Sequence, residues 1–298
     1  MSDLHPAALR AVARTRGEGL HLWGRMLGLA SVPDDVPRAD DEYLLQAAGA
    51  DITSLATLTD VGAGYTIRGH LGDQVRLATT SLSLQPIGPA AAAASGPVTC
   101  RSRLIWLAPD LSRALVRGYV TDPGGAPIAT ATVWMVVLSS EPAASLVPMP
   151  WEGPGAGPAL TESDLTPDEW TFAVSASAAI ARSAASRRPV PEELLDVTWT
   201  LGSDTRLIGT VPHGPHLGNR VGNVQGGALF GLAATAATRL VGGQQLADGS
   251  VQYLRPGTGG DLQVTATMVR RGRTVSAVDA TVTCDRRELI GARFSLMA

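Results

Sequence analysis

Short stretches of alternating apolar and polar residues recur along the chain and predict β-strands. Alternation of this kind places one face of a segment against a core and the other towards solvent. The stretch 20–29 is also expected to form a strand. The remaining predicted strands fall into two sets, 75–84, 98–107, 113–121 and 127–138 in the first half, and 194–201, 206–211, 245–254, 262–269, 275–284 and 288–296 in the second.

Two longer stretches have helical periodicity instead. Apolar residues from Leu229 to Leu240 recur at a spacing that puts them on one helical face, and small residues between them suit burial. The stretch 43–67 has the same character and contains a single acid near its centre, Asp60. A shorter helix is expected at 174–186, and 2–15 could form either another short helix or a loose arm.

The two halves repeat the same order of elements: strand, loop, helix, strand and three more strands. Such a repeat is the strongest clue to architecture. An offset of 174 residues aligns the helices, pairing Asp60 with Ala234 and Ile52–Thr53 with Gly226–Gly227. We therefore expect a first domain over 1–140, a linker rich in Pro, Ala and Gly over 141–191, and a second domain over 192–298.

The start of the second long helix is the best candidate for chemistry. Gly226 and Gly227 let the backbone come close to another group, and the first N–H groups of a helix have no partner within it. A helix start of this kind favours an anion or a polarised carbonyl oxygen.

The sequence here resembles the hot-dog acyl-CoA thioesterases, most of all the phenylacetate-pathway type, over roughly 196–298. The matching residues are Asn219, Gly222, Gln225-Gly226-Gly227, YLRP at Tyr253–Pro256 and RRGR at Arg270–Arg273. The YLRPG and GGAL segments also resemble type II acyl-CoA thioesterases. Two positions depart from the family pattern, which usually has His at Gln225 and often an acid at Ala234.

The resemblance implies an α+β fold, a tandem (double) hot-dog in which each unit is an antiparallel sheet wrapped around a central helix. It also implies an active site between the units, where helix-start amides of one face a carboxylate of the other. In this chain that combination would be Asp60 with Gln225, Gly226 and Gly227. Asp60 could act as a general base or attack directly; alternatively, it is a surface acid on a helix.

Four further residues have candidate roles from the family pattern, each with a simpler alternative. Asn219 would contact the substrate carbonyl or fix its loop, unless it is an ordinary turn residue. Ser81, on the strand after the acid-bearing helix, could position water. Arg271 and Arg273 could hold the phosphates of CoA, or belong to a solvated hairpin.

Composition limits the other possibilities. An apolar fraction of 45% and a net charge of −3 describe a soluble globular protein without a nucleic-acid partner. All 24 basic residues are Arg, which leaves Arg as the one strong phosphate ligand. Two cysteines indicate no disulfide framework, and His213 and His216 in a Pro/Gly loop predict no metal. Without a signal-like or membrane-spanning run, we expect a cytoplasmic protein.

The sequence thus predicts an acyl-CoA thioesterase that uses no metal or organic cofactor and takes acyl-CoA as substrate. We also expect a homo-oligomer, a dimer or higher. The first alternative is a catalytically silent acyl-CoA-binding protein, in which Gln225 and Ala234 mark lost activity. A hot-dog enoyl-CoA hydratase ranks third, because that enzyme needs a His paired with an acid.

Overall fold

The computed structural model describes residues 4–18, 22–32, 41–72, 75–87, 96–138, 159–219 and 221–298. Twelve of their strands form one antiparallel sheet, in the order β1-β2-β4-β5-β6-β3-β9-β12-β11-β10-β8-β7. In chain order the strands are β1 (Ala30–Ser31), β2 (Glu42–Ala47), β3 (Arg76–Pro86), β4 (Val98–Leu107), β5 (Arg113–Thr121), β6 (Pro127–Leu138), β7 (Thr198–Ser203), β8 (Arg206–Val211), β9 (Gln245–Tyr253), β10 (Leu262–Arg270), β11 (Val275–Cys284) and β12 (Arg287–Met297).

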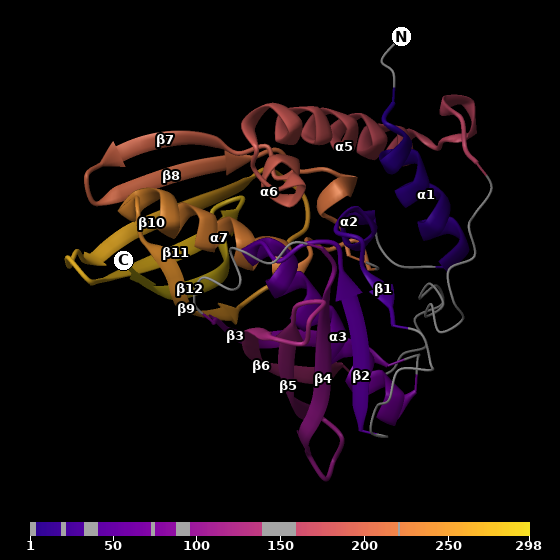
Figure 1. The fold of residues 1–298 in the computed structure, drawn as a ribbon, viewed down its shortest axis with the longest axis horizontal. Helices are drawn as coiled ribbons and strands as arrows, with labels where there is room; N and C mark the ends of the chain where they lie inside the picture. The colour runs from indigo at the N-terminus through magenta and orange to yellow at the C-terminus, as the bar shows by residue number, and fades with distance from the viewer. Residues whose placement is uncertain are drawn as a thin grey trace.

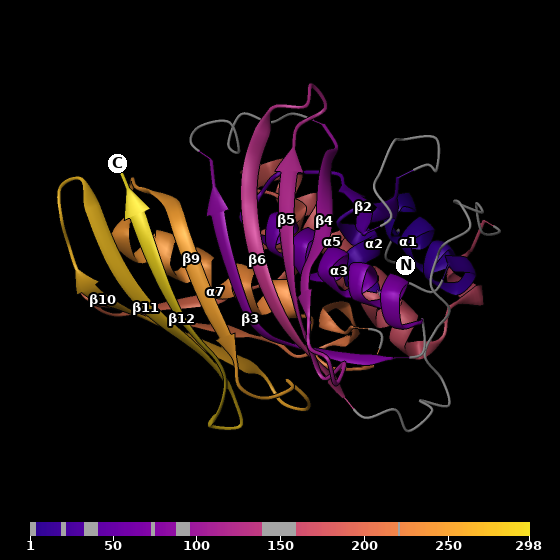
Figure 2. The same cartoon turned by 90° about the horizontal axis from the view of Figure 1, so that it is seen from below.

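The sheet consists of two equivalent halves joined at one seam. The order β2-β4-β5-β6-β3 of the first half is repeated in reverse by β9-β12-β11-β10-β8 of the second. The seam pairs β3 with β9, and Ser81↔Gln252 to Leu84↔Gly249 are in register across it (Figure 2). The predicted tandem of antiparallel sheets around central helices is confirmed.

The two central helices, α3 (Ile52–Leu71) and α7 (Gly226–Val241), lie on the same face of the sheet (Figure 2). Their first residues, Ile52 and Gly226, are the pair that the sequence repeat aligned. The apolar residues of α7 face strands β10, β11 and β12, while α3 packs on β2, β4 and β5. The core of each half is therefore one helix pressed onto its own strands.

The two helices also pack directly on each other, and two glycines permit the contact. A Cβ atom added at Gly227 would lie 2.3 Å from the Cα of Thr57, and one at Gly231 would lie 2.7 Å from the Cβ of Thr53. Because the residue numbers of the contacts rise along α7 and fall along α3, the helices cross antiparallel. The start of α7 thereby comes to lie beside the middle of α3.

Four further helices gather at one end of the molecule (Figure 1). They are α1 (Pro6–Glu18), α2 (Leu22–Met26), α5 (Pro167–Ser186) and α6 (Val190–Leu194). Within this layer α1 packs on α2 and α5, and α6 reaches both α3 and α7. The buried indole of Trp23 donates to Thr57 Oγ1 at 3.1 Å, which ties α2 to α3.

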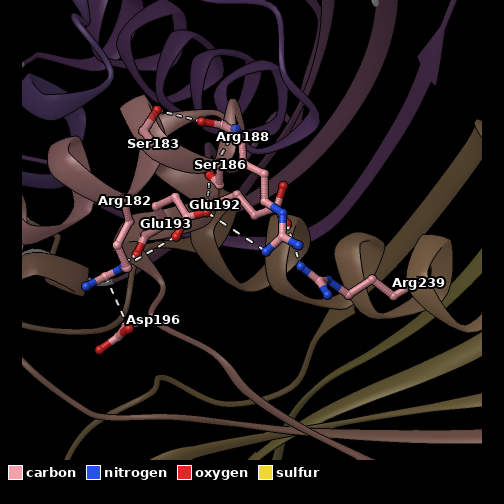
Figure 3. Close-up of polar contacts among 8 residues, drawn as sticks. All are labelled: Arg182, Ser183, Ser186, Arg188, Glu192, Glu193, Asp196 and Arg239. Atoms are coloured by element: carbon pink, nitrogen blue, oxygen red, sulfur yellow. Dashed lines mark hydrogen bonds and ion pairs between the residues drawn. The ribbon is translucent and has the colours of Figure 1, made fainter.

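A polar network fastens α5 and α6 to the second half (Figure 3). Arg182 of α5 donates to the Glu193 carbonyl at 2.7 Å and pairs with Asp196 at 3.1 Å. Arg239 of α7 pairs with Glu192 of α6 at 3.1 Å. Exposed ion pairs contribute little each, so the network fixes the position of α6 more than it stabilises the fold.

Two predicted elements were wrong. The stretch 20–29 contains the short helix α2, because the Trp23 and Leu27 side chains lie one helical turn apart against a common core. The stretch 43–67 is divided into strand β2 and helix α3, since Asp51 caps the helix between them. Part of the predicted linker, 141–158, lies outside the described residues, and the rest contains α5 and the first residues of α6.

No helix in the described part of the chain is both long enough and apolar enough to cross a membrane.

The helix crossing predicts that Gly227→Ala destabilises the fold. Its Cβ would meet the backbone of Thr57 at 2.3 Å, and backbone atoms cannot rotate away. Overpacking of this kind costs about 1–3 kcal/mol or more, which urea denaturation would measure. Gly69→Ala in α3 is the matched control, because no atom lies within 4 Å of its added Cβ, and it should gain up to about 1 kcal/mol of helix stability. Equal stability of the two variants would contradict the crossing.

Candidate active site

A pocket of about 500 Å³ lies where the two halves meet. The first half contributes α3 from Asp60 to Arg68, the start of β3, and the end of β6. The second half contributes the loop from Asn219 to Gln225, the first residue of α7, and the segment from Tyr253 to Gly257. Asp60 and the Gln225–Gly226 segment therefore share one cavity.

Asp60 is the acid of this pocket, and both of its carboxylate oxygens are held. Thr79 Oγ1 donates to Oδ1 at 2.6 Å, and Gln225 Nε2 donates to Oδ2 at 3.0 Å. Only 8% of Asp60 is exposed. Burial raises the pKa of this carboxyl to about 6, against the lowering effects of Thr79, Gln225 and Arg68. At neutral pH the group is ionised but weakly hydrated and basic.

The carboxylate lies against the start of α7. A Cβ atom added at Gly226 would come within 2.8 Å of Asp60 Oδ2 and 3.3 Å of the Tyr253 ring. Position 226 therefore requires glycine because the acid and the tyrosine occupy the space that a side chain would need. The acid of one half and the helix start of the other are in direct contact.

Gln225 caps α7 in a way that leaves amides free. Its Oε1 accepts from the N–H of Ala228, the third residue of the helix, at 2.9 Å. No acceptor in the described part of the chain takes the N–H of Gly226 or Gly227. Two unpaired donors at a positive helix end suit a developing oxyanion.

The opposite combination, at the start of α3, is different. There the cap is Asp51, whose Oδ1 accepts from the N–H groups of both Thr53 and Ser54. Ala234, the partner position of Asp60, is fully buried and carries no acid. The start of α3 thus has no acid at the partner position 234 of α7, no glycine pair and no free second amide.

Gly227 lets the backbone of α7 come close to α3. The missing side chain faces Thr57 of α3, not the pocket, so the residue permits the helix crossing. Its N–H group remains a candidate donor, although Gly226 and not Gly227 lines the pocket. A substitution at this position would disturb the fold before it could obstruct a ligand.

Thr79, not Ser81, contacts the acid. The pairing of β3 with β6 shifts by one residue between Thr79 and Ser81, and such a bulge reverses the side on which the following residues lie. Leu82 and Leu84 are then buried, while Ser83 and Gln85 pair across the other face with Ser250 and Asp248. Ser81 lies with that second set, and it is absent from the lining of the pocket.

Asn219 lines the pocket and folds its own loop. Its Oδ1 accepts from the N–H groups of Val221 at 2.9 Å and Asn223 at 3.1 Å. The backbone of Gln225 is in turn held by the carbonyl of Leu217 at 2.8 Å. Of the two roles expected for Asn219, these contacts match the loop-fixing one.

Arg271 and Arg273 lie far from this pocket. Arg271 Nη2 donates to the carbonyls of Leu240 at 3.2 Å and Asp204 at 3.4 Å, at the C-terminal end of α7. That end is about 20 Å along the helix from Gly226. Neither arginine lines the pocket, whose cations are Arg68, Arg76 and Arg255. The role expected for Arg271 and Arg273 in holding the phosphates of CoA stays a prediction, and it does not involve the lining of the cavity that holds Asp60.

The two loop histidines do not form a metal centre with their neighbours. His216 is buried, and burial lowers the pKa of its ring to about 4. Among the described residues no group of three His, Cys, Asp or Glu side chains is placed to hold a metal ion.

Two residues of the site were missed by sequence reasoning, Thr79 and Tyr253. Tyr253 lies within the YLRP segment of the resemblance, yet nothing in its spacing indicates that its hydroxyl reaches the α7 start. Thr79 was missed because alternation alone cannot locate a bulge.

Comparisons with known proteins bear on the fold and on the second half. Residues 216–297 match a family model described as the acyl-CoA thioesterase N-terminal domain, although they lie in the C-terminal half of this chain. No curated protein sequence matches the chain.

Several solved structures share the arrangement of both halves. The tesB protein of Mycobacterium avium subspecies paratuberculosis has a TM-score of 0.55 at 11% identity, with 92% of this chain and 98% of that chain covered. A candidate thioesterase II from Thermobifida fusca has a TM-score of 0.52 at 16% identity, with 92% and 96% covered. A candidate oleoyl thioesterase from Lactobacillus plantarum has a TM-score of 0.52 at 12% identity, with 86% and 96% covered. The chain therefore has the double hot-dog fold, and its second half has the sequence pattern of an acyl-CoA thioesterase domain.

Proposed function

We propose that the protein is an acyl-CoA thioesterase, which hydrolyses an acyl-CoA thioester to a free acid and CoA at one site between its halves. The observation that carries the proposal is the contact between Asp60 of α3 and the start of α7, through the 3.0 Å bond to Gln225. The family match over residues 216–297 supports the substrate class.

The reaction needs a base and an oxyanion site, and the contact supplies both. Asp60 takes a proton from water while the water oxygen attacks the thioester carbonyl carbon. The negative charge that develops on the carbonyl oxygen is met by the free N–H groups of Gly226 and Gly227. The C–S bond then breaks, and the proton held by Asp60 passes to the departing thiolate. These steps require no metal or organic cofactor.

We assign Asp60 as general base in preference to nucleophile. Both carboxylate oxygens already accept a hydrogen bond, from Thr79 and from Gln225. These bonds stabilise the charged form and hold the group still, which weakens direct attack on carbon. Each oxygen retains a lone pair that can accept a proton from water.

The remainder of the lining suits the two ends of an acyl-CoA molecule. Val61, Tyr65, Leu77 and Met135 provide apolar surface for an acyl chain. Three arginines, Arg68, Arg76 and Arg255, stand against the single acid, in a chain whose net charge is −3. Such an excess of Arg fits the phosphates of CoA.

An unchanged KM in the Arg76→Gln variant would remove Arg76 from that role.

The central kinetic prediction concerns Asp60. Asp60→Asn keeps the volume and can retain both neighbours, since the Thr79 hydroxyl can accept as well as donate. We expect CoA release from a panel of acyl-CoAs to fall about 10²–10⁴-fold. A non-hydrolysable acyl-CoA analogue should bind as before. The exposed Asp110→Asn is the matched control, and it should have wild-type turnover.

The pH dependence of the wild-type enzyme completes this test. Because the pKa of Asp60 is raised to about 6 and the ionised form is the base, kcat/KM should be flat above pH 7 and fall tenfold per unit well below pH 6. Full turnover in Asp60→Asn would remove the residue from the mechanism. A wild-type protein that binds the analogue and releases no CoA from any thioester would instead be a silent binding protein.

The bulge in β3 predicts a contrast between Thr79 and Ser81. Thr79→Ala removes a hydrogen bond to a charged group, which is worth about 1.5–3 kcal/mol, so kcat should fall roughly 10- to 100-fold. The pH midpoint should also rise, because the Thr79 bond lowers the pKa of Asp60. Thr79→Ser should restore most activity, and Ser81→Ala should leave activity within about twofold. The reverse pattern would mean that Ser81 faces the acid.

A further inference from the structure

Tyr253 is the last residue of β9, and its side chain reaches the start of α7. Its hydroxyl donates to the carbonyl oxygen of Gly226 at 2.9 Å. The ring lies against the same residue, since a Cβ added at Gly226 would be 3.3 Å from Tyr253 Cε1. Both the ring and the hydroxyl therefore bear on one residue of the site.

The carbonyl that Tyr253 holds belongs to the peptide group of a candidate donor. Gly226 C=O and Gly227 N–H share one planar peptide unit, and in a trans peptide they point in opposite directions. Fixing the oxygen therefore fixes the direction of the N–H. A hydrogen bond to the oxygen also polarises the N–H through the peptide group.

This peptide is the first one within α7, so its carbonyl also accepts the intrahelical N–H of Phe230. Gly226 and Gly227 have the widest backbone freedom of any residue pair, and their N–H groups have no acceptor in the described part of the chain. The Gln225 cap holds the next residue, Ala228, and not this peptide. Tyr253 adds a second hydrogen bond to the same carbonyl, from strand β9.

We infer that Tyr253 is a positioning residue, which orients the Gly226–Gly227 peptide so that its N–H points at the oxyanion of the substrate. The inference rests on the proposed function. Burial raises the pKa of the Tyr253 hydroxyl above its ordinary value, with a smaller contribution from Asp60. The hydroxyl therefore stays protonated and remains a donor.

The test is Tyr253→Phe, which keeps the ring against Gly226 and removes only the hydroxyl. Complete loss of an oxyanion donor lowers kcat by about 10²–10³, so a donor that is still present but loosely held should cost on the order of 10-fold. KM and the affinity for a non-hydrolysable analogue should change little. The pH midpoint should remain near that of the wild type, because Asp60 is untouched. Tyr119→Phe, at an exposed tyrosine outside the pocket, is the matched control with wild-type turnover.

Unchanged kcat in Tyr253→Phe would overturn the inference. A displaced pH midpoint would also do so, because Tyr253 would then act on Asp60 and not on the peptide. The backbone order parameter of the Gly227 amide tests positioning without turnover, and it should fall from the rigid value of about 0.85 towards 0.6 in Tyr253→Phe. If the wild type hydrolyses no thioester, the proposed function fails, and an unchanged order parameter separately overturns the role of Tyr253.

Discussion

The close crossing of α7 over α3 is the contact on which the site depends. Gly227 and Gly231 bring the backbone of α7 against Thr57 and Thr53 of α3 with no side chain between them. This close packing determines which residue of α3 lies beside the start of α7. That residue is Asp60. The seam between β3 and β9 fixes the same alignment from the other side of the two helices. A helix pair held further apart would leave the acid and the amides in separate cavities.

The second consequence of the crossing is electrostatic. A carboxylate buried in this cavity would be costly if it had no partners, and Thr79, Gln225 and the nearby positive end of α7 provide them. Burial still exceeds these effects, so the pKa of Asp60 rises to about 6. The result is an acid that is charged at neutral pH and basic enough to take a proton from water. Its symmetric counterpart, Ala234, is apolar and fully buried.

Much of the fold could be predicted from the sequence because its signals are periodic and repeated. Strands β4, β5 and β6 begin and end at the predicted residues, since alternation of apolar and polar residues defines them. The repeat paired Asp60 with Ala234 because both helices start at equivalent caps. The contact of Thr79 with the acid could not be predicted, because a one-residue bulge leaves no periodic trace in the sequence. The strand predicted over 20–29 was wrong for another reason, since tertiary packing of Trp23 overrides a short alternating pattern.

The central claim is that each chain has one complete site, composed of Asp60 from the first half and the α7 start from the second. Calorimetric titration of the Asp60→Asn protein with the analogue of the acyl-CoA that wild type hydrolyses fastest tests it most directly, because binding is then counted without turnover. The account predicts saturation at one equivalent per chain, since the α3 start has its second amide bonded to Asp51 and no glycine pair. Two equivalent sites per chain would contradict it.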